Sequence, residues 1–487
     1  MPPSMKSVHG NKRVVLIYPN TRWFAKRAWM AIPYAALILT ALLKDEYDFH
    51  FVDANGPDLS EGDLRTVLRD MTPDVVMVSG GSVEYHKQVH RTFAVAREAC
   101  PDAITILGGV YPTTLPEEAV KDRNIDWLFM YHAEERLIPF LDLVLSGRVS
   151  EAKGYPGIAY RDENGGLVEN PIAGHIGSVR NMVKPDYSLI NIRPYLGNTY
   201  HGFKYLSDVP SAFILSSYGC PNNCLFCASR TVSGRGTAFR PVEDVLDEID
   251  YLVAEKGVKH LIFMDDAFLV NKERVHAILS AVIERQYDLT WMPANVAAWD
   301  MSDELIALMK KSGCTHISIS IESGSPRVLR HVIRKPLKLD IIPEVVRKCR
   351  DAGIYVTANF IIGLPGETWD EILQTVRYAE VCDCDMAMFN IATPLPRTDL
   401  HKICLERGYL PEDFSFLDDR FFGFAVGFIT TEEFTPEELS CIRTFEWDRI
   451  NFGAPEKIER VARMYGTSVE VLNEHRKNNR RKGGRHF

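Results

Sequence analysis

The sequence lacks any apolar stretch of the length that crosses a bilayer, which is about 20 residues. Its first residues, Met1 to Lys6, also lack the apolar core of a secretory signal peptide. We therefore expect a cytoplasmic protein that is not inserted in a membrane.

Excess positive charge and a disulfide framework are missing too. The formal net charge is -9, so nucleic acid is not expected as a partner. The ten cysteines are scattered over 487 residues without the spacing of a disulfide-stapled secreted domain. With 46% hydrophobic and 25% charged residues, the composition is typical of a globular protein of two or three domains.

Three of the cysteines stand together, in the stretch Cys220-Pro-Asn-Asn-Cys224-Leu-Phe-Cys227. An apolar run at 212–218 precedes them and ends at the turn-forming Gly219, so the loop is expected at the C-terminal end of a strand. A zinc site would need a fourth Cys or His nearby, and none stands there. Three thiolates at this spacing can hold three corners of an iron–sulfur cube and leave one iron without a protein ligand.

Ahead of this loop, apolar strands alternate with helical patterns. This alternation predicts an α/β domain with a doubly wound parallel sheet, Rossmann-like in kind. The predicted strands are 13–18, 49–52, 74–78, 103–107 and 126–130, and the predicted helices are 34–43, 62–69, 85–99 and 116–120. A hairpin is predicted at 157–167, within a connecting segment rich in Pro, Gly and Asn. No GxGxxG follows the first strand, so a dinucleotide site is not expected.

Beyond the cysteine loop, the same alternation resumes and then gives way to helices. Six strands are predicted, at 213–215, 260–264, 289–293, 316–321, 355–362 and 386–392. Helices are predicted between them, at 241–255, 272–285, 302–311, 339–351 and 369–381. The last part of the chain is predicted to be mainly helical, with helices at 436–451, 455–464 and 468–476.

The CxxxCxxC spacing, with the aromatic Phe226 before its last cysteine, resembles the radical S-adenosylmethionine (SAM) superfamily. The resemblance implies a [4Fe-4S] cluster on Cys220, Cys224 and Cys227 that cleaves SAM reductively to a 5′-deoxyadenosyl radical. It implies that the six strands form a partial (β/α)6 barrel, and that an external donor such as flavodoxin or ferredoxin supplies electrons. We expect the Rossmann-like domain at 1–147, a linker at 148–211, the barrel at 212–410 and a C-terminal helical domain at 411–487.

The same resemblance assigns polar strand ends of the barrel to SAM. Either Asp265 or Asp266, after the second strand, would face the amino group of SAM, and a helix cap is the alternative interpretation. Ser320 and Glu322, at the end of the fourth strand, are candidates for the ribose or the carboxylate of SAM.

Gly363, after the fifth strand, would let the backbone approach the adenine of SAM, and Phe226 is expected at the same site. Glu367 is expected to begin the next helix and to interact with its dipole. Asn295 stands where many members of the superfamily have Arg.

An α/β domain directly ahead of this motif resembles the cobalamin-binding domain of one large branch of the superfamily. The DxHxxG motif is absent, since Asn55 stands two residues after Asp53, which implies no histidine as lower ligand. The implied cobalamin contacts are Ser79, Gly80, Gly108, Gly109 and Tyr111.

Two loops depart from that branch. Gly-Gly-Val-Tyr at 108–111 stands where the branch often has Gly-Gly-Pro-His, and Tyr-His-Ala-Glu at 131–134 stands where it often has Gly-Glu-Gly-Glu. These substitutions would place bulk where a corrin needs room, so a domain kept for packing or for partner binding is the alternative.

The leading hypothesis is a radical SAM C-methyltransferase, which methylates an unactivated carbon of a small biosynthetic intermediate in a cobalamin-dependent reaction. A second hypothesis keeps the cluster and omits cobalamin, and gives a radical dehydration, rearrangement or oxidoreduction. A third, an iron–sulfur electron carrier or sensor, predicts no cleavage of SAM.

Overall fold

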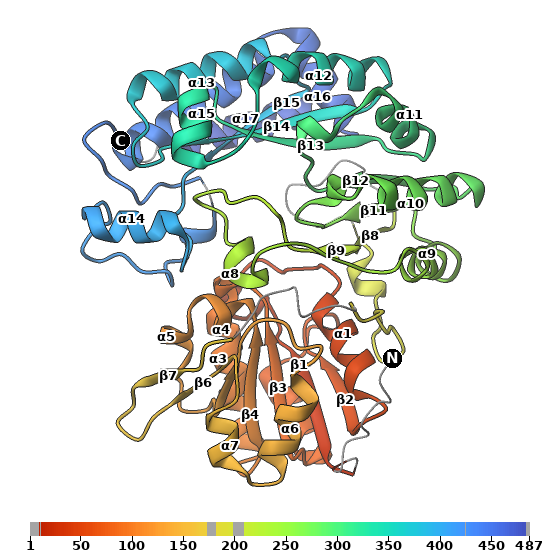
Figure 1. Ribbon diagram of the computed structural model, residues 1–487, viewed down its shortest axis with the longest axis vertical. Coiled ribbons are helices and arrows are strands. Elements are labelled where there is room, and N and C mark those ends of the chain that lie inside the picture. The colour runs from red at the N-terminus through yellow and green to blue at the C-terminus, as the bar shows by residue number, and fades with distance from the viewer. Residues whose placement is uncertain (1–8, 10, 173–181, 198–208, 424, 484–487) are drawn as a thin grey trace. The chain divides into compact units, whose positions relative to one another are not determined.

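The computed structural model describes residues 9, 11–172, 182–197, 209–423 and 425–483 (Figure 1). The chain divides into two compact units. Unit 1 comprises Met1–Tyr200 and Thr231–Asp244, and unit 2 comprises His201–Arg230 and Val245–Phe487. Parts of the predicted linker and the N-terminal Met1 to Lys6 lie outside the described residues.

Unit 1 contains a seven-stranded sheet in the order β2-β1-β3-β4-β5-β6-β7. The first five strands are parallel, as predicted for a doubly wound sheet, and β6 and β7 are antiparallel to their neighbours. The strands are β1 (Arg13–Tyr18), β2 (Asp48–Asp53), β3 (Val75–Gly80), β4 (Ile104–Gly109), β5 (Trp127–Phe129), β6 (Ile158–Arg161) and β7 (Leu167–Glu169).

Helices separate these strands and cover the sheet. They are α1 (Tyr34–Leu43), α2 (Glu61–Met71), α3 (His86–Ala99), α4 (Val110–Thr114), α5 (Pro116–Ala119), α6 (Leu137–Leu145) and α7 (Val149–Lys153), with 3₁₀ turns η1 (Trp23–Ala25), η2 (Val83–Tyr85) and η4 (Arg193–Tyr195). The residues Val14 to Ile17 of β1 are fully buried or nearly so, as expected for a central parallel strand that is covered on both faces. The predicted hairpin forms as β6 and β7, and it extends the edge of this sheet.

Unit 2 contains the six predicted parallel strands of the barrel. Three of them pair in the order β8-β11-β12 and three in the order β13-β14-β15, and parallel bridges from Trp291 to Cys314 and from Val296 to Ile319 join β12 to β13. The partial barrel is thereby confirmed. The strands are β8 (Ser211–Ile214), β11 (His260–Phe263), β12 (Thr290–Pro293), β13 (His316–Glu322), β14 (Tyr355–Ile362) and β15 (Met386–Ile391), and unit 2 also contains the short β9 (Ser217–Tyr218). The short β10 (Ala238–Phe239) belongs to the part of the chain assigned to unit 1.

The helices after β9 are α8 (Ser229–Ser233), α9 (Val242–Asp250), α10 (Lys272–Glu284), α11 (Asp303–Lys311), α12 (Ile342–Asp351), α13 (Trp369–Val381), α14 (Asp399–Arg407), α15 (Pro436–Phe452), α16 (Pro455–Met464) and α17 (Val469–Gly483). Most of them match the predicted ones to within a few residues. The structure adds α8 and α14, which the sequence analysis does not predict, it ends α9 at Asp250, and it continues the last helix beyond residue 476. The 3₁₀ turns are η6 (Phe268–Val270), η7 (Ala298–Asp300), η9 (Leu339–Ile341) and η10 (Phe421–Gly423), and η5 (Tyr251–Glu255) and η8 (Val328–Ile333) are π-helical.

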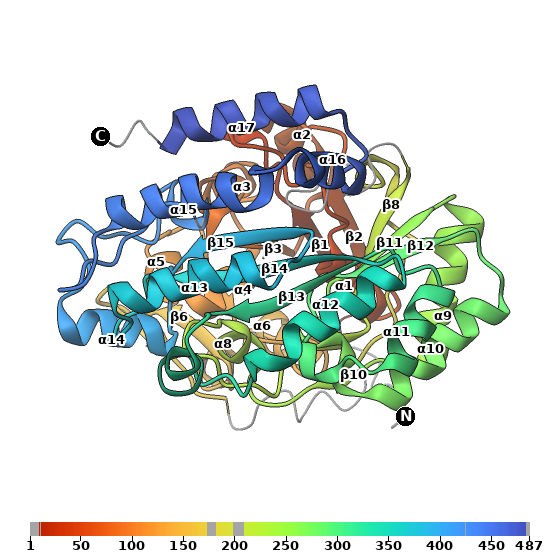
Figure 2. The ribbon, with the colours of Figure 1, turned by 90° about the horizontal axis from the view of Figure 1, so that it is seen from above.

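The C-terminal helices α15, α16 and α17 pack on the strands of the barrel (Figure 2). One apolar cluster joins Ile262 of β11, Met292 of β12 and Met386 of β15 to Phe452 and Val461 of the helices. The helices therefore share a core with the barrel strands. The boundary expected at residue 410 stays a prediction.

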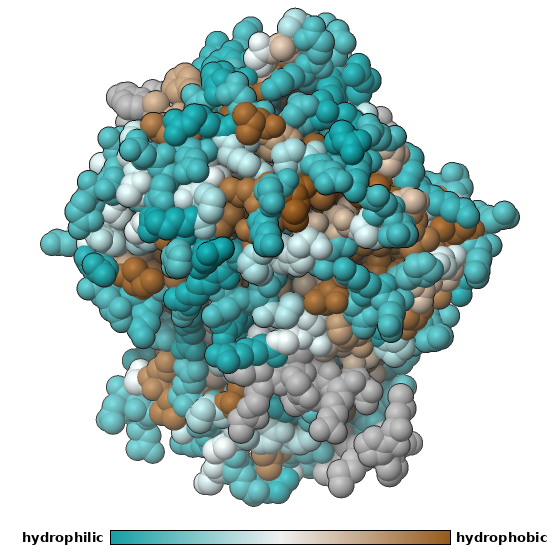
Figure 3. Space-filling model, turned by 45° about the horizontal axis from the view of Figure 1, so that its top comes forward, coloured by the Kyte–Doolittle hydropathy of each residue, from teal (hydrophilic) through white to brown (hydrophobic). Residues whose placement is uncertain are grey.

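On the face shown in Figure 3, hydrophobic residues are interspersed among hydrophilic ones. Within the described residues, no helix combines the length and the apolar character that a membrane crossing requires.

Candidate functional site

The three cysteines lie on the loop after β9, each partly buried and none in a disulfide. Burial raises the pKa of the thiol to about 12 in Cys224 and to about 11 in Cys227, because a thiolate is poorly stabilised away from water. The three groups are close enough for the charge of one to raise the pKa of another. A metal centre would take the place of the protons and remove this penalty, since a coordinating thiol is deprotonated.

A single metal ion does not suit this loop. Among the residues that the structure describes, no group of three or more His, Cys, Asp or Glu side chains is placed to hold one ion. In an iron–sulfur cluster each cysteine binds a different iron, so the sulfurs need not converge on one point. Three free thiols with mutual electrostatic influence therefore fit a [4Fe-4S] cluster.

The cysteine loop is fixed by backbone hydrogen bonds to two other segments. The Leu225 amide donates to the Ile333 carbonyl at 3.0 Å, and the Leu225 carbonyl accepts from the Leu400 amide at 3.1 Å. Phe226, expected at the SAM site, is partly buried within the loop. These bonds tie the loop to the end of η8 and to α14.

The two aspartates after β11 have different surroundings. Asp265 is 2% exposed and accepts hydrogen bonds from the Ser216 amide at 2.9 Å, the Ser216 hydroxyl at 2.6 Å and the Ser217 hydroxyl. Burial raises the pKa of Asp265. Asp266 is exposed, accepts from the Ser229 hydroxyl at 2.7 Å, and adds to the rise in the pKa of Cys220 and Cys227. Of the two, Asp266 faces the cysteine loop, and Asp265 anchors the strand end.

A polar network occupies the end of β13. The Ser320 hydroxyl donates to Oδ1 of Asn295 at 2.7 Å, and the Ser320 carbonyl accepts from Nζ of Lys335 at 2.6 Å. The same Nζ lies 2.9 Å from Oε1 of Glu322. Sequence reasoning named Ser320 and Glu322 but missed Lys335. The available signal was the buried carboxylate itself, which needs a cation as its partner.

Close packing and a buried carboxylate fix the conformation of the turn after β14. Gly363 has φ +86°, and a Cβ atom there would lie 2.3 Å from Cδ1 of Leu439. Oε2 of Glu367 accepts from the amides of Gly363 at 2.8 Å and Leu364 at 3.1 Å, and burial raises the pKa of Glu367 to about 8. The expectation that Glu367 begins the helix was wrong, because Thr368 caps α13 and Glu371 completes the capping box.

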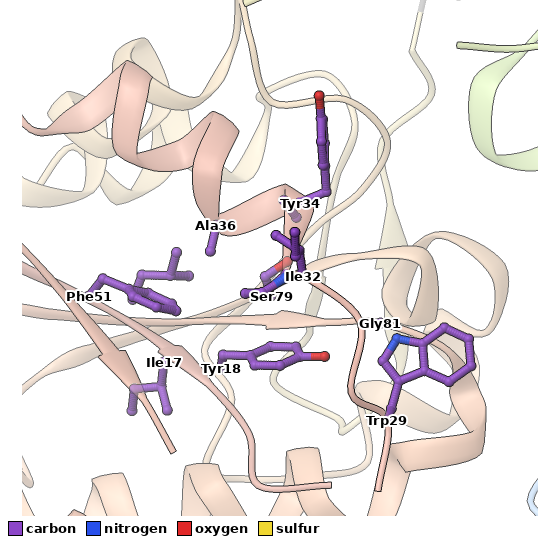
Figure 4. A pocket seen from close by; sticks show the side chains of 12 residues that line it. Ile17, Tyr18, Trp29, Ile32, Tyr34, Ala36, Phe51, Ser79 and Gly81 are labelled. Atoms are coloured by element: carbon purple, nitrogen blue, oxygen red, sulfur yellow. The ribbon is translucent and has the colours of Figure 1, made fainter. Parts of the chain in front are cut away.

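A second candidate site lies in unit 1, where the order of the sheet reverses. The chain passes from β1 to β2 on one side and then to β3 on the other, and open α/β sheets bind ligands above such a point. A cavity of about 180 Å³ lies there (Figure 4). Aromatic side chains and a hydroxyl line much of it, from Tyr18, Trp29, Tyr34, Phe51 and Ser79.

The neighbouring strand ends of β3 and β4 form a ledge of bare backbone. Ser79 pairs with Gly108, and Gly80 pairs with Gly109, so three of these four residues have no side chain. Gly109 has φ +100°, a conformation that favours glycine. A Cβ atom on Gly108 would meet nothing nearer than the Phe129 carbonyl at 3.7 Å. A flat ligand can approach the backbone here, which fits the corrin ring of cobalamin.

The bulk expected from Tyr111 does not occupy the ledge. Tyr111 is fully buried, and its hydroxyl lies 2.9 Å from Nε2 of His90 on α3. Nδ1 of His90 in turn lies 2.8 Å from Oδ2 of Asp122. In this structure Tyr111 offers no surface to a ligand, and it holds the start of α4 against the core.

Asn55, at the position of the missing histidine, is also fully buried. Its Oδ1 accepts from the amide of Thr21 at 2.9 Å and from the hydroxyl of the same residue at 2.6 Å. Its Nδ2 donates to the Trp29 carbonyl at 3.0 Å. Asn55 therefore connects the loops after β1 and β2, and its side chain is engaged within the protein.

Two family models match the chain. The model of the Radical SAM superfamily matches residues 214–379, and the model of the B12 binding domain matches residues 24–138. These ranges contain the cysteine loop and the strand-end ledge, respectively.

Curated relatives match over most of their length. An uncharacterized methyltransferase of Pyrococcus horikoshii is 28% identical over 402 residues, which are 82% of this chain and 84% of that protein. Cytidylyl-2-hydroxyethylphosphonate methyltransferase of Streptomyces wedmorensis is 27% identical over 412 residues, which are 78% of this chain and 76% of that protein.

Solved structures share the fold. The radical SAM methyltransferase TsrM of Kitasatospora setae, with cobalamin and a [4Fe-4S] cluster bound, gives a TM-score of 0.65 at 19% identity and covers 82% of this chain and 78% of that one. The cobalamin-dependent SAM radical enzyme OxsB gives a TM-score of 0.69 at 17% identity and covers 96% of this chain and 72% of that one.

Proposed function

Because this chain belongs to the radical SAM superfamily, in the branch that carries an N-terminal B12-binding domain, we propose that it is a cobalamin-dependent C-methyltransferase. Its substrate in this proposal is a small biosynthetic intermediate with an unactivated carbon. The curated relatives named as methyltransferases support the transfer of a methyl group.

The observation that carries the proposal is the presence of two different cofactor sites in one chain. Unit 2 offers three thiols that suit a cluster, and unit 1 offers a backbone ledge beside an aromatic cavity. An electron carrier needs the first site but has no use for the second. A cobalamin-independent radical enzyme likewise leaves the second unexplained.

In unit 2, Cys220, Cys224 and Cys227 would hold the cluster, which when bound supplies the electron that cleaves SAM reductively. Asp266 extends a carboxylate toward the loop, and we assign it the amino group of SAM. Ser320 provides a hydroxyl at the end of β13, and we assign it the ribose of SAM.

The remaining residues predicted at the SAM site contribute to its charge and shape in this proposal. Glu322 is held by Lys335, so we assign it an electrostatic role beside SAM. Gly363 allows the turn after β14, and Glu367 holds that turn closed through its two amide contacts. Phe226 supplies an apolar side chain within the cysteine loop.

In unit 1, the ledge of Ser79, Gly80, Gly108 and Gly109 would receive cobalamin, which when bound supplies the methyl-transfer chemistry. The cavity beside the ledge has aromatic walls, which suit an apolar part of the cofactor. Asn55 is engaged with Thr21 and Trp29, so no protein side chain is proposed as a lower ligand.

We place the enzyme in the cytoplasm, where thiols stay reduced, and propose a reduced flavodoxin or ferredoxin as its electron donor. The domain boundaries expected from the sequence are retained as part of this proposal.

The cluster is tested with anaerobically reconstituted protein, SAM and a reductant. Wild-type protein is expected to form 5′-deoxyadenosine, and Cys224→Ala is expected to lose both the cluster iron and this product. Cys441→Ala is the matched control, because Cys441 is also partly buried but lies on α15. Wild-type protein that binds the cluster but forms no 5′-deoxyadenosine at any reducing strength would instead support an electron carrier.

A further inference from the structure

Lys335 and Glu322 form a buried ion pair beside the cysteine loop. Nζ of Lys335 lies 2.9 Å from Oε1 of Glu322, and the two side chains are 7% and 8% exposed. Lys335 also donates to the Ser320 carbonyl at 2.6 Å. Burying two charges is costly even when they are paired, so such a pair is weak evidence for stability and calls for another explanation.

The backbone departs from regular geometry on both sides of this pair. The pairing of β13 with β14 shifts register between Ser320 and Glu322, and Glu322 has φ +73°. Arg334, directly before Lys335, has φ +67° at the end of the π-helical η8. Left-handed conformations are uncommon for residues other than glycine and concentrate at functional sites. The fold thus uses two such positions to bring these side chains together.

A backbone hydrogen bond also connects the segment that carries Lys335 to the cysteine loop. The Leu225 amide, between Cys224 and Cys227, donates to the carbonyl of Ile333, two residues before Lys335. A displacement of the loop would therefore also displace the segment that carries Lys335.

The two members of the pair carry opposite charges. A positive charge favours additional negative charge nearby and a negative charge disfavours it, so the two would act in opposite directions on a cluster held by the loop.

We propose that Lys335 is a positioning residue that sets the reduction potential of the cluster, with Glu322 as the opposing charge. Reduction adds one negative charge to the cluster, and a buried ammonium group beside the loop stabilises that charge. Glu322 disfavours it. This inference rests on the proposed function only in requiring a reducible [4Fe-4S] cluster on the loop.

The test is a redox titration of the reconstituted full-length protein. The electron paramagnetic resonance signal of the reduced cluster measures the reduced fraction at each potential. Lys335→Met is expected to lower the midpoint potential, and Glu322→Gln is expected to raise it. Lys335→Arg keeps the charge and is expected to stay near the wild-type value. The double variant Lys335→Met with Glu322→Gln removes both charges, and its potential is expected to lie between those of the single variants.

Arg334→Gln is the matched control. Arg334 precedes Lys335 directly, but it pairs with Asp399 at the surface, and the two side chains are 43% and 52% exposed. The same loss of one charge is therefore screened by water and is expected to change the potential little. Lys335→Met alone leaves Glu322 buried without its partner, and that variant could fail to fold. In that case the comparison of wild type, Glu322→Gln and the double variant tests the inference.

Equal potentials for wild type, Glu322→Gln and the double variant, each with full cluster iron, would overturn the inference. A lower potential in Arg334→Gln that equals the one in Lys335→Met would overturn it as well. A wild-type protein that takes up no cluster would refute the proposed function instead, so the two failures are distinguishable.

Discussion

The side-chain amide of Asn451 on α15 bonds to both backbone groups of Ala387 on β15. Oδ1 of Asn451 accepts from the Ala387 amide at 2.7 Å, and Nδ2 donates to the Ala387 carbonyl at 2.8 Å. Nearby, Nε of Arg443 donates to the Phe389 carbonyl at 2.9 Å. Strand β15 is the last of its sheet, so side chains of a helix satisfy the edge that a further strand would otherwise pair.

Asn451→Ala is expected to destabilise unit 2, because it leaves a buried N–H and a buried C=O of β15 without partners. The expected loss is roughly 2 kcal/mol or more in the free energy of unfolding, measured by chemical denaturation. Asn478→Ala, at an exposed position of α17, is the control and is expected to change stability by less than about 0.5 kcal/mol. Equal stability of the two variants would refute this role of Asn451.

Gly363→Ala is expected to destabilise the turn after β14 for two reasons. The residue has φ +86°, and the added Cβ would lie 2.3 Å from Leu439. Gly408→Ala is the control, since Gly408 has φ +67° but no atom lies within 4 Å of the added Cβ. Both variants are measured by the midpoint temperature of thermal unfolding. The larger decrease expected for Gly363→Ala measures the cost of the clash between the added Cβ and Leu439 on α15. Replacement of Leu439 by Ala is expected to recover part of the stability of Gly363→Ala but none of that of Gly408→Ala.

Because of two buried histidines in the barrel, we expect the folded state of unit 2 to become less stable as the pH falls. Burial lowers the pKa of His260 to about 4 and that of His316 to about 3, from 6.5. The unfolded state then binds more protons than the folded state below pH 6.5, so stability falls as pH falls from 6.5 toward the folded pKa.

His316→Gln removes one of these protonation sites. Its stability relative to wild type is expected to improve by roughly 2 kcal/mol between pH 7.5 and pH 5, measured by denaturation at both values. His276→Gln, at an exposed position, is the control and should show no such change. An identical pH dependence in wild type and His316→Gln would contradict the assigned cause.

Gly108→Val is expected to prevent cobalamin from binding without unfolding unit 1. The glycine has room for a Cβ atom, whose nearest neighbour would be a carbonyl at 3.7 Å, but the branched side chain would stand on the ledge. Gly62→Val, on the exposed start of α2, introduces the same group elsewhere. Corrin content, read from the visible spectrum after reconstitution, should fall only in Gly108→Val, while cluster iron stays unchanged in both. Retention of corrin by Gly108→Val would contradict the ledge as its site.

Hydrophobic periodicity was sufficient to predict the five parallel strands of unit 1 and the six strands of the barrel. It also predicted helices such as α1, α13 and α16, whose bounds the structure reproduces. The thiol spacing likewise predicted the cluster loop. Side-chain orientation was less accessible. Tyr111 was expected on the ledge, but its hydroxyl bonds to His90, a partner 21 residues earlier that no local pattern indicates.

The network at β13 was hidden for a related reason. Lys335 reaches Glu322 only because a bulge and a left-handed residue redirect both segments, and neither feature has a reliable sequence signal. Glu367 was misassigned because an acid before a helix resembles a helix-start residue, while its bonds to the Gly363 and Leu364 amides depend on the tight turn. Side-chain interactions that depend on close tertiary packing therefore could not be predicted from the sequence patterns.

Cobalamin-dependent methylation is tested most directly by the balance of products from one anaerobic preparation that contains cluster, cobalamin, SAM, reductant and a candidate substrate. An enzyme of this kind is expected to show bound corrin in the visible spectrum and to form both 5′-deoxyadenosine and S-adenosylhomocysteine in step with a methylated product. Formation of 5′-deoxyadenosine by protein that retains no corrin and yields no S-adenosylhomocysteine would contradict cobalamin-dependent methylation.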